Sequence, residues 1–326
     1  MENKIDVVAL GELLIDMTNN GVSDNNNMLF EANPGGAPCN VLAMLKRFGH
    51  SVGFIGKVGD DMFGLTLKKV LEEIGIDTTG LAMDKEVHTT LAFVRTFEDG
   101  DRDFSFYRNP GADMMLDKDE VNMELIKKAK IFHFGTLSMT HEKCREATIC
   151  ALEEAKKNGA LITFDPNLRE HLWNSLDEAK EQILTGFKYC DYLKISDNEI
   201  RWLTGEEDFT AGVHKIRKEY NISLITVSMG KEGSRAYYLD KNGSEIIAEE
   251  KPFLSDKTIE TTGAGDTFCG TVLHFLLTYG IDGLDEDRLH EMLTVANAAA
   301  SLITRVKGAL RVMPEISEVE ELIKSR

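Results

Sequence analysis

The sequence predicts an α/β protein with a mainly parallel sheet covered by helices and a small β-sheet lid. Strand-like and helix-like segments alternate along most of the chain, and one section reads instead as two strands without a following helix. With 326 residues, 42% of them hydrophobic, the chain has enough apolar material to bury a large core. We therefore expect a compact globular fold.

The alternation consists of short apolar runs that are each followed by a stretch with helical periodicity. The expected pairs are a strand at 5–10 and a helix at 38–48, a strand at 131–134 and a helix at 141–158, a strand at 161–164 and a helix at 176–184, and a strand at 192–195 and a helix near 198–203, before a last strand at 223–227. Repeated strand–helix units of this kind place their strands in parallel.

Residues 88–107 break the alternation. Two strand-like runs, TTLAFVRTF and RDFSFYR, flank the turn EDGD at 98–101, which predicts a β-hairpin. Together with the polar stretch 18–30, this hairpin is expected to form a small sheet that projects over a cleft. We interpret it as a lid formed by about 12–34 and 86–111, and not as a separate domain.

Charge and targeting signals exclude some classes of partner. The formal net charge of −18 repels phosphate backbones, so nucleic acid is not an expected partner, and an anionic nucleotide would need local positive fields. The N-terminal segment lacks signal-peptide features and no run of about 18 apolar residues follows, so we expect a cytoplasmic protein without membrane contact. Five cysteines without a CxxC pair indicate buried thiols, not a disulfide framework or a zinc site.

The segment ETTGAGDTFCG at 260–270 precedes an apolar helical run and places Gly263, Ala264 and Gly265 at a helix N-terminus. Backbone N–H groups and the helix dipole make such an end an anion site, and glycine allows a phosphate to approach closely. Asp266 follows at once, where its carboxylate could accept the proton of an attacking hydroxyl. The alternative is a helix start capped by Thr262, in which Asp266 only interacts favourably with the dipole.

A second glycine cluster, NPGGAPCN at 33–40, also precedes a helix. It could bring Gly35, Gly36 and the Asn40 amide against a polyol, although a tight turn before a helix explains the same pattern. Asp16 follows the first strand and could accept hydrogen bonds from sugar hydroxyls, but a solvated loop aspartate is the alternative.

Arg108 and Arg169 are candidates for the positive charge that an anionic ligand would need, although an isolated arginine is often a surface residue. A dinucleotide-binding dehydrogenase is disfavoured, because the first strand leads to GELLID and not to a GxGxxG fingerprint.

Taken together, these motifs resemble the ribokinase-like (PfkB) family of carbohydrate kinases and, within it, the bacterial fructokinases. The match runs nearly end to end in the family's order, through GELLID, PGGAPCNV, GKVGDDMFG, DGDRDFSFYRNPGAD, FDPNLREHLW, KISDNEIRWLTG, VSMGKEG, ETTGAGDTF and NAAASLITRVKGA. The resemblance implies a ribokinase-like three-layer α/β/α sandwich, with 1–326 as a single kinase domain that binds ATP and a small sugar.

The resemblance also implies roles for individual residues. It assigns Asp266 as the base and the N–H groups of 263–265 as the anion hole. The other assignments are Asp16, Gly35, Gly36 and Asn40 for the sugar, Tyr107 and Arg108 for a substrate-facing lid element, Asn167 and Arg169 near the transferred phosphate, Ser228, Gly230 and Gly233 along the nucleotide, and Asn297 near the adenine.

Two positions depart from the family pattern. The Asn-x-x-Glu segment that helps to organise Mg²⁺ begins here with Ser196, while Glu199 is retained, so we expect Mg²⁺ to be held by Glu199 through water. Glu260 stands where relatives that bind a monovalent cation usually carry Asp, which leaves potassium activation open.

The expected reaction is ATP-dependent phosphorylation of fructose to fructose 6-phosphate, because the segment 99–113 resembles fructokinases more than ribokinases. A 2-keto-3-deoxygluconate kinase is the closest enzyme alternative, and nucleoside kinases come next. A sugar-sensing protein without catalysis is a further alternative, but such a protein should have lost the base or the cradle, and both are present.

The expected lid strands carry apolar side chains that a monomer would expose, namely Leu91, Phe93, Phe104 and Phe106. Pairing of two lids would cover them. We therefore expect a homodimer formed through the lid.

Overall fold

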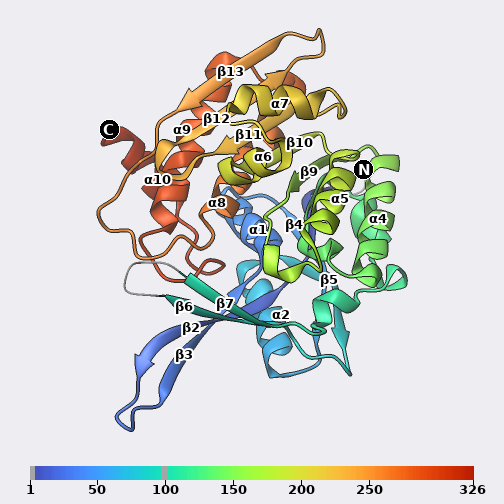
Figure 1. Cartoon of the computed structure of the whole chain (residues 1–326), viewed down its shortest axis with the longest axis vertical. Coiled ribbons are helices and arrows are strands. Elements are labelled where there is room, and N and C mark those ends of the chain that lie inside the picture. The colour runs from blue at the N-terminus through green and yellow to red at the C-terminus, as the bar shows by residue number, and fades with distance from the viewer. Residues whose placement is uncertain (1–3, 97–101) are drawn as a thin grey trace.

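The computed structural model describes residues 4–96 and 102–326 and has two sheets (Figure 1). A nine-stranded sheet lies between layers of helices, and a four-stranded sheet stands at one side of it. The predicted α/β fold, with a large and mainly parallel sheet and a small sheet, is confirmed.

The large sheet has the strand order β13-β12-β11-β10-β9-β8-β1-β4-β5. Strands β11 to β5 in that order pair in parallel, while β12 and β13 add an antiparallel edge. The strands are β1 (Ile5–Leu10), β4 (Val52–Gly59), β5 (Asp77–Asp84), β8 (Ala129–Gly135), β9 (Leu161–Asp165), β10 (Tyr192–Ser196), β11 (Leu224–Ser228), β12 (Ser234–Leu239) and β13 (Glu245–Glu250).

Helices cover both faces of this sheet and create two cores. In β1 the side chains of Val7 and Ala9 belong to one core and those of Val8 and Leu10 to the other, because successive strand residues point to opposite faces. The helices are α1 (Ala37–Arg47), α2 (Met62–Ile74), α3 (Met123–Lys127), α4 (Glu142–Lys157), α5 (Leu176–Phe187), α6 (Asp197–Thr204), α7 (Phe209–Arg217), α8 (Ala264–Tyr279), α9 (Glu286–Ile303) and α10 (Ile316–Lys324).

The helix ends follow from local sequence. Asp61 caps α2 by accepting hydrogen bonds from the Phe63 and Gly64 N–H groups, and Gly75 ends it with a left-handed φ of 85°. At α6, Ser196 and Glu199 form a capping box, which explains why this short helix begins directly after β10.

The small sheet has the order β3-β2-β6-β7, formed by β2 (Leu14–Val22), β3 (Met28–Gly35), β6 (Leu91–Thr96) and β7 (Arg102–Tyr107). The pairs β2–β3 and β6–β7 are antiparallel hairpins, and β2 joins β6 in parallel. The segments 18–30 and 88–107 thus contribute to one small sheet, as predicted, while the predicted turn at 98–101 lies outside the described residues.

The exposure that we expected along the small sheet is partly wrong. Leu91, Phe93 and Phe106 are half-buried, because they pack against neighbouring side chains, and the side chain of Phe104 lies outside the described part. Among the side chains that the structure describes, the exposed large apolar ones of this sheet are instead Val22, Met28, Leu29 and Tyr107.

The cysteines fit their expected role. All five are free thiols, and all but Cys150 are buried. In the part of the chain that the structure describes, none of the helices combines the length and the apolarity needed to span a bilayer.

The packing of α5 on the sheet generates a first prediction. A Cβ at Gly186 would lie 2.7 Å from the fully buried Phe164 ring, so Gly186→Ala forces overpacking that outweighs its gain in helix propensity. We expect the free energy of unfolding to fall by about 1–3 kcal/mol in urea titrations. Adding Phe164→Leu should make the double mutant less destabilised than the sum of the single changes, and strict additivity would contradict the contact.

Candidate active site

A cavity of about 590 Å³ opens where the small sheet meets the carboxyl ends of the central parallel strands. This is the edge of a parallel sheet at which ligands usually bind. Its lining comes from segments far apart in the sequence: Glu12, Leu14, Asp16, Gly36, Ala37, Asn40, Phe106, Leu137, Asn167, Leu168, Arg169, Glu170, His171, Lys194, Glu260, Thr261, Thr262, Gly263, Gly265 and Asp266.

Asp266 lies in the first turn of α8 and is 8% exposed. The first residue of the helix is Ala264. Gly263 is the N-cap, which has a left-handed φ of 78° and provides no side-chain hydrogen bond. Asn40 donates from Nδ2 to Asp266 Oδ2 at 2.7 Å. Burial raises the pKa of Asp266, while the Asn40 hydrogen bond and the charges of Lys194 and Arg169 act to lower it.

Asn40 joins the two predicted glycine-rich segments. Its side chain extends from α1 to Asp266, and its Oδ1 is buried without a hydrogen-bond partner among the described residues. Since Nδ2 is directed at a carboxylate, Oδ1 is an acceptor that a ligand hydroxyl can satisfy.

Glu12 fixes the start of α1. Its Oε1 accepts a hydrogen bond of 2.7 Å from the Ala37 N–H, which replaces the side-chain cap that Gly36 cannot supply. Gly36 has a φ of 133°, and a Cβ there would lie 2.4 Å from the Glu12 carbonyl oxygen. Gly36 therefore allows the close approach that brings Asn40 to the cavity. Burial also raises the pKa of Glu12 to about 7.

Asp16 comes from β2 and is paired in register with Asn33 of β3. A Cβ at Gly35 would lie 2.4 Å from Asp16 Oδ2, so the carboxylate occupies the space that this glycine leaves open. The small sheet thus brings a carboxylate into the same cavity as Asp266.

A buried ion pair lies behind Asp266. Lys194 of β10 contacts Asp165 Oδ2 at 2.9 Å, and their side chains are 7% and 5% exposed. A Cβ on Gly265 would lie 3.1 Å from Lys194 Nζ, so the ammonium group is beside the first turn of α8. Burial acts to lower the pKa of Lys194, but the carboxylates of Asp165, Glu199 and Asp266 raise it, and the residue remains a cation.

The predicted phosphate-side residues line an adjoining cavity of about 410 Å³, which shares Asn167, Arg169 and Lys194 with the first. Arg169 donates to Asn167 Oδ1 at 2.8 Å. Glu199 accepts from Ser196 through Oε2 and from the Leu168 N–H through Oε1 at 2.7 Å. Although burial acts to raise the pKa of Glu199, Lys194 and these hydrogen bonds hold it below its usual value.

Ser228, Gly230, Gly233 and Asn297 form a separate group that does not line the Asp266 cavity. Ser228 pairs with Ser234 across β11 and β12, and Ser234 donates to Asn297 Oδ1 at 2.9 Å. The Asn297 Nδ2 donates to the carbonyl oxygens of Glu250 and Lys251, so this amide holds the end of β13 against α9.

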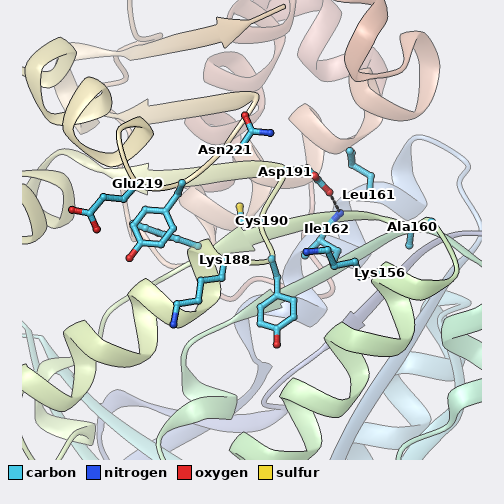
Figure 2. Close-up of a pocket in the computed structure, with 13 residues that line it drawn as sticks. Lys156, Ala160, Leu161, Ile162, Lys188, Cys190, Asp191, Glu219 and Asn221 are labelled. Atoms are coloured by element: carbon cyan, nitrogen blue, oxygen red, sulfur yellow. Dashed lines mark hydrogen bonds between the residues drawn. The ribbon is translucent and has the colours of Figure 1, made fainter. Parts of the chain in front are cut away.

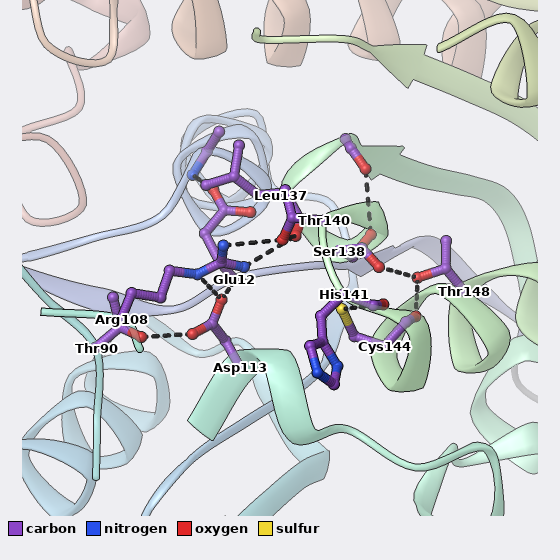
Figure 3. Close-up of polar contacts among 12 residues, drawn as sticks. Glu12, Thr90, Arg108, Asp113, Leu137, Ser138, Thr140, His141, Cys144 and Thr148 are labelled. Atoms are coloured by element: carbon purple, nitrogen blue, oxygen red, sulfur yellow. Dashed lines mark hydrogen bonds and ion pairs between the residues drawn. The ribbon is translucent and has the colours of Figure 1, made fainter. Parts of the chain in front are cut away.

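Tyr107 and Arg108, which the resemblance assigns to a substrate-facing lid element, do not line the Asp266 cavity. Tyr107 is 68% exposed on the outer face of β7, because its neighbour Phe106 faces inward and side chains alternate along a strand. The Arg108 guanidinium is buried and bound to Asp113, Thr140 and the Leu137 carbonyl oxygen (Figure 3). All of its nitrogens are engaged within the protein.

Sequence reasoning missed several lining residues. Phe106 and His171 approach across the cavity with ring centroids 5.2 Å apart, which joins the small sheet to the loop after β9. Lys194 carried a recognisable signal, since a lysine inside the apolar run YLKIS of a central parallel strand must be paired with an acid. The partner could not be chosen without the structure.

Another cavity, of about 860 Å³, lies at the amino ends of the parallel strands (Figure 2). It is lined by residues that begin or precede strands, including Leu161, Ile162 and Asp191, together with Lys156 and Lys188. Since parallel strands bind ligands beyond their carboxyl ends, the smaller Asp266 cavity remains the candidate active site.

Comparisons with known proteins agree with this geometry. A family model described as pfkB family carbohydrate kinase matches residues 4–316. Probable fructokinase-2 from Arabidopsis thaliana is 41% identical over 325 residues, which cover 99% of this chain and 97% of the relative. Fructokinase from Xylella fastidiosa, solved with bound ATP, has a TM-score of 0.87 at 29% identity, with 98% of both chains covered.

A further similar structure was solved with both a sugar and a nucleotide bound. It is a double mutant of fructokinase from Vibrio cholerae O395 with fructose, ADP and a potassium ion. It has a TM-score of 0.84 at 26% identity, and the similarity covers 99% of this chain and 100% of the other.

The burial of Glu12 predicts a pH-dependent stability. Because its pKa rises from 4.5 to about 7 on folding, the folded state holds the proton more tightly, and stability falls as pH rises through this interval. Glu12→Gln cannot ionise, so its stability relative to the wild type should increase by up to about 3 kcal/mol between about pH 5 and about pH 8. Urea unfolding at both pH values measures the difference, and a constant difference would contradict the burial effect.

Proposed function

The chain belongs to the pfkB family of carbohydrate kinases, and on that premise we propose that it transfers the γ-phosphate of ATP to the 6-hydroxyl of fructose, with Asp266 as the catalytic base. The observation that carries the proposal is the buried Asn40–Asp266 hydrogen bond at the N-terminus of α8, inside a cavity that Asp16 also lines. Fructose is supported by the fructokinases that resemble this chain.

The sugar is held by side chains of both sheets. Asp16 and Asn40 orient its hydroxyl groups, with Asn40 Oδ1 as an acceptor that none of the described residues uses. Gly35 and Gly36 contribute indirectly, because Gly35 leaves the space that the Asp16 carboxylate occupies and Gly36 allows the close approach that brings Asn40 to the cavity. Specificity of this kind depends on matched polar groups, because a missing hydroxyl leaves a buried acceptor unpaired.

Proton transfer and charge stabilisation fall to different residues. Asp266 accepts the proton of the attacking hydroxyl, and its buried position keeps water away from that proton. The N–H groups of 263–265 and the Arg169 guanidinium stabilise the charge that develops on the transferred phosphoryl group. Lys194 balances the carboxylates around it, which favours an ionised Asp266.

The residues present fit Mg²⁺ bound with ATP. No cluster of three or more potential metal-ligating His, Cys, Asp or Glu residues occurs within the described ranges. Glu199 already accepts hydrogen bonds at both oxygens and would hold Mg²⁺ through water, as suits an ion that keeps most of its waters and binds mainly to phosphates. When bound, Mg²⁺ neutralises phosphate charge.

The remaining ligands to be placed are the nucleotide and a monovalent cation. Ser228, Gly230, Gly233 and Asn297 would border the nucleotide from the β11–β12 side. Potassium activation is a separate expectation: Glu260, at the position where relatives that bind a monovalent cation usually carry Asp, accepts hydrogen bonds from Thr262 and from the Gly308 N–H, which lies 3.4 Å from its Oε2.

We further propose that the small sheet acts as a lid and mediates a homodimer. Its exposed side chains Val22, Met28, Leu29 and Tyr107 form apolar surface that a second copy would cover. Light scattering at micromolar concentration tests this, and a monomer would contradict it without affecting the catalytic proposal. A cytoplasmic location and the absence of nucleic-acid and membrane partners stay predictions of the sequence.

The function is tested by ADP release from ATP and Mg²⁺ with fructose, 2-keto-3-deoxygluconate, ribose or adenosine, and without a sugar. We expect the highest kcat/KM with fructose. We expect a lower kcat/KM with the acid, because it would need an additional cation and Arg108, one of the two candidate arginines, is bound within the protein. Turnover on another member would reassign the substrate, and inactivity of folded protein across the panel would favour a sensor without catalysis.

The base assignment predicts that Asp266→Asn lowers turnover by about 10²-fold or more, the usual contribution of a positioned base. The amide can still accept the Asn40 hydrogen bond, so sugar and ATP should bind with nearly unchanged affinity by calorimetry. Turnover close to the wild-type rate would rule out Asp266 as the base.

A further inference from the structure

The two ends of the β6–β7 hairpin meet at one buried carboxylate. Thr90, which precedes β6, donates to Asp113 Oδ1, and Arg108, which follows β7, donates from Nε to Asp113 Oδ2 at 2.7 Å. Arg108 Nη2 also lies 2.6 Å from this oxygen, and both charged side chains are only 2% exposed. We call Thr90, Arg108 and Asp113 the anchor.

The anchor is bound to the main sheet by the other nitrogens of the guanidinium. Arg108 Nη1 donates to Thr140 Oγ1 at 2.9 Å, and Nη2 donates to the Leu137 carbonyl oxygen at 2.9 Å. Leu137 and Thr140 belong to the turn after β8, and Leu137 lines the Asp266 cavity. Figure 3 shows Arg108 between Asp113 on one side and Leu137 and Thr140 on the other.

Two cavity-lining groups depend directly on the anchor. Phe106 is two residues before Arg108 and therefore on the same face of the chain, where its ring meets His171. The Thr90 carbonyl oxygen accepts a hydrogen bond of 3.2 Å from the Ile15 N–H, next to Asp16. Movement of the anchor would displace both Phe106 and Asp16.

We propose that Thr90, Arg108 and Asp113 are positioning residues that hold the small sheet at the angle required to close over the sugar. This inference rests on the proposed function and extends it to residues outside the cavity. Arginine is needed because its planar fork binds the carboxylate, a hydroxyl and a carbonyl group at once, whereas lysine has a single nitrogen to offer.

The role predicts effects on the coupling of ATP use to sugar phosphorylation. With a displaced sheet, the sugar is held less well and water enters the cavity more readily. For Thr90→Val, which removes a single buried hydrogen bond, we expect KM for fructose to rise about tenfold and ATP hydrolysis without sugar to increase relative to sugar phosphorylation. KM for ATP should change by less than about twofold.

Arg108→Lys should show the same pattern more strongly. If that variant fails to fold, Thr90→Val still tests the proposal, because it keeps the buried ion pair. Hydrogen exchange of the β6 and β7 amides provides a readout without substrate, and we expect faster exchange in both variants.

The matched control is Arg217→Lys. Arg217 has a side chain that is 9% exposed, pairs with Glu245, and donates to the carbonyl oxygens of Ile222, Ser223 and Tyr237, but it lies on α7 away from the small sheet. This control should lower Tm and leave KM for fructose and the hydrolysis ratio unchanged.

The outcomes separate the two hypotheses. If the wild-type protein phosphorylates no sugar, the proposed function fails, while the exchange rates still test the anchor. If the wild type is active but Thr90→Val and Arg108→Lys only lower Tm, as the control does, the anchor is merely structural and the inference is overturned.

Discussion

The candidate active site depends on charge balance at the carboxyl ends of a parallel sheet. Asp165, Glu199 and Asp266 come from three different elements, surround Lys194 and are all buried. Three carboxylates in such a place would repel one another and would tend to become protonated. Lys194 makes the arrangement possible, because it pairs with Asp165 and attracts the other two. The polar residues of α6, α8 and the loop after β9 can therefore gather at a single place.

The fold was predictable where one sequence pattern had one structural solution. The apolar runs at 5–10 and 161–164 became β1 and β9, because a strand that is buried on both faces needs such a run. The break at 88–107 became a hairpin, since two strand-like runs around a turn leave no room for a helix. The order of the strands and the parallel β2–β6 pair were not predicted, because they depend on contacts between distant segments.

The site was predictable to the extent that its residues lie in continuous motifs. Asp266, Asn40 and Asp16 do meet in one cavity, although Asp266 follows the other two by more than two hundred residues of chain. Arg108 shows the limit of this reasoning, since a motif gives the presence of a cation but not its direction. Successive side chains of a strand point to opposite faces. Phe106 therefore lines the cavity, whereas Tyr107, which the resemblance assigned to the substrate, is exposed on the other face.

The parallel β2–β6 pair has a consequence for how a sugar is selected. Asp16 lies on β2 and Phe106 on β7. Both strands are hydrogen-bonded to β6 through the backbone, so they belong to one continuous sheet. If the small sheet closes as a lid, as proposed, the two side chains move together, and a ligand that draws in Asp16 also brings Phe106 over itself. Under the proposed function, recognition and shielding form a single event. A mismatched sugar is then doubly penalised, because it binds less well and also remains less protected from competing hydrolysis.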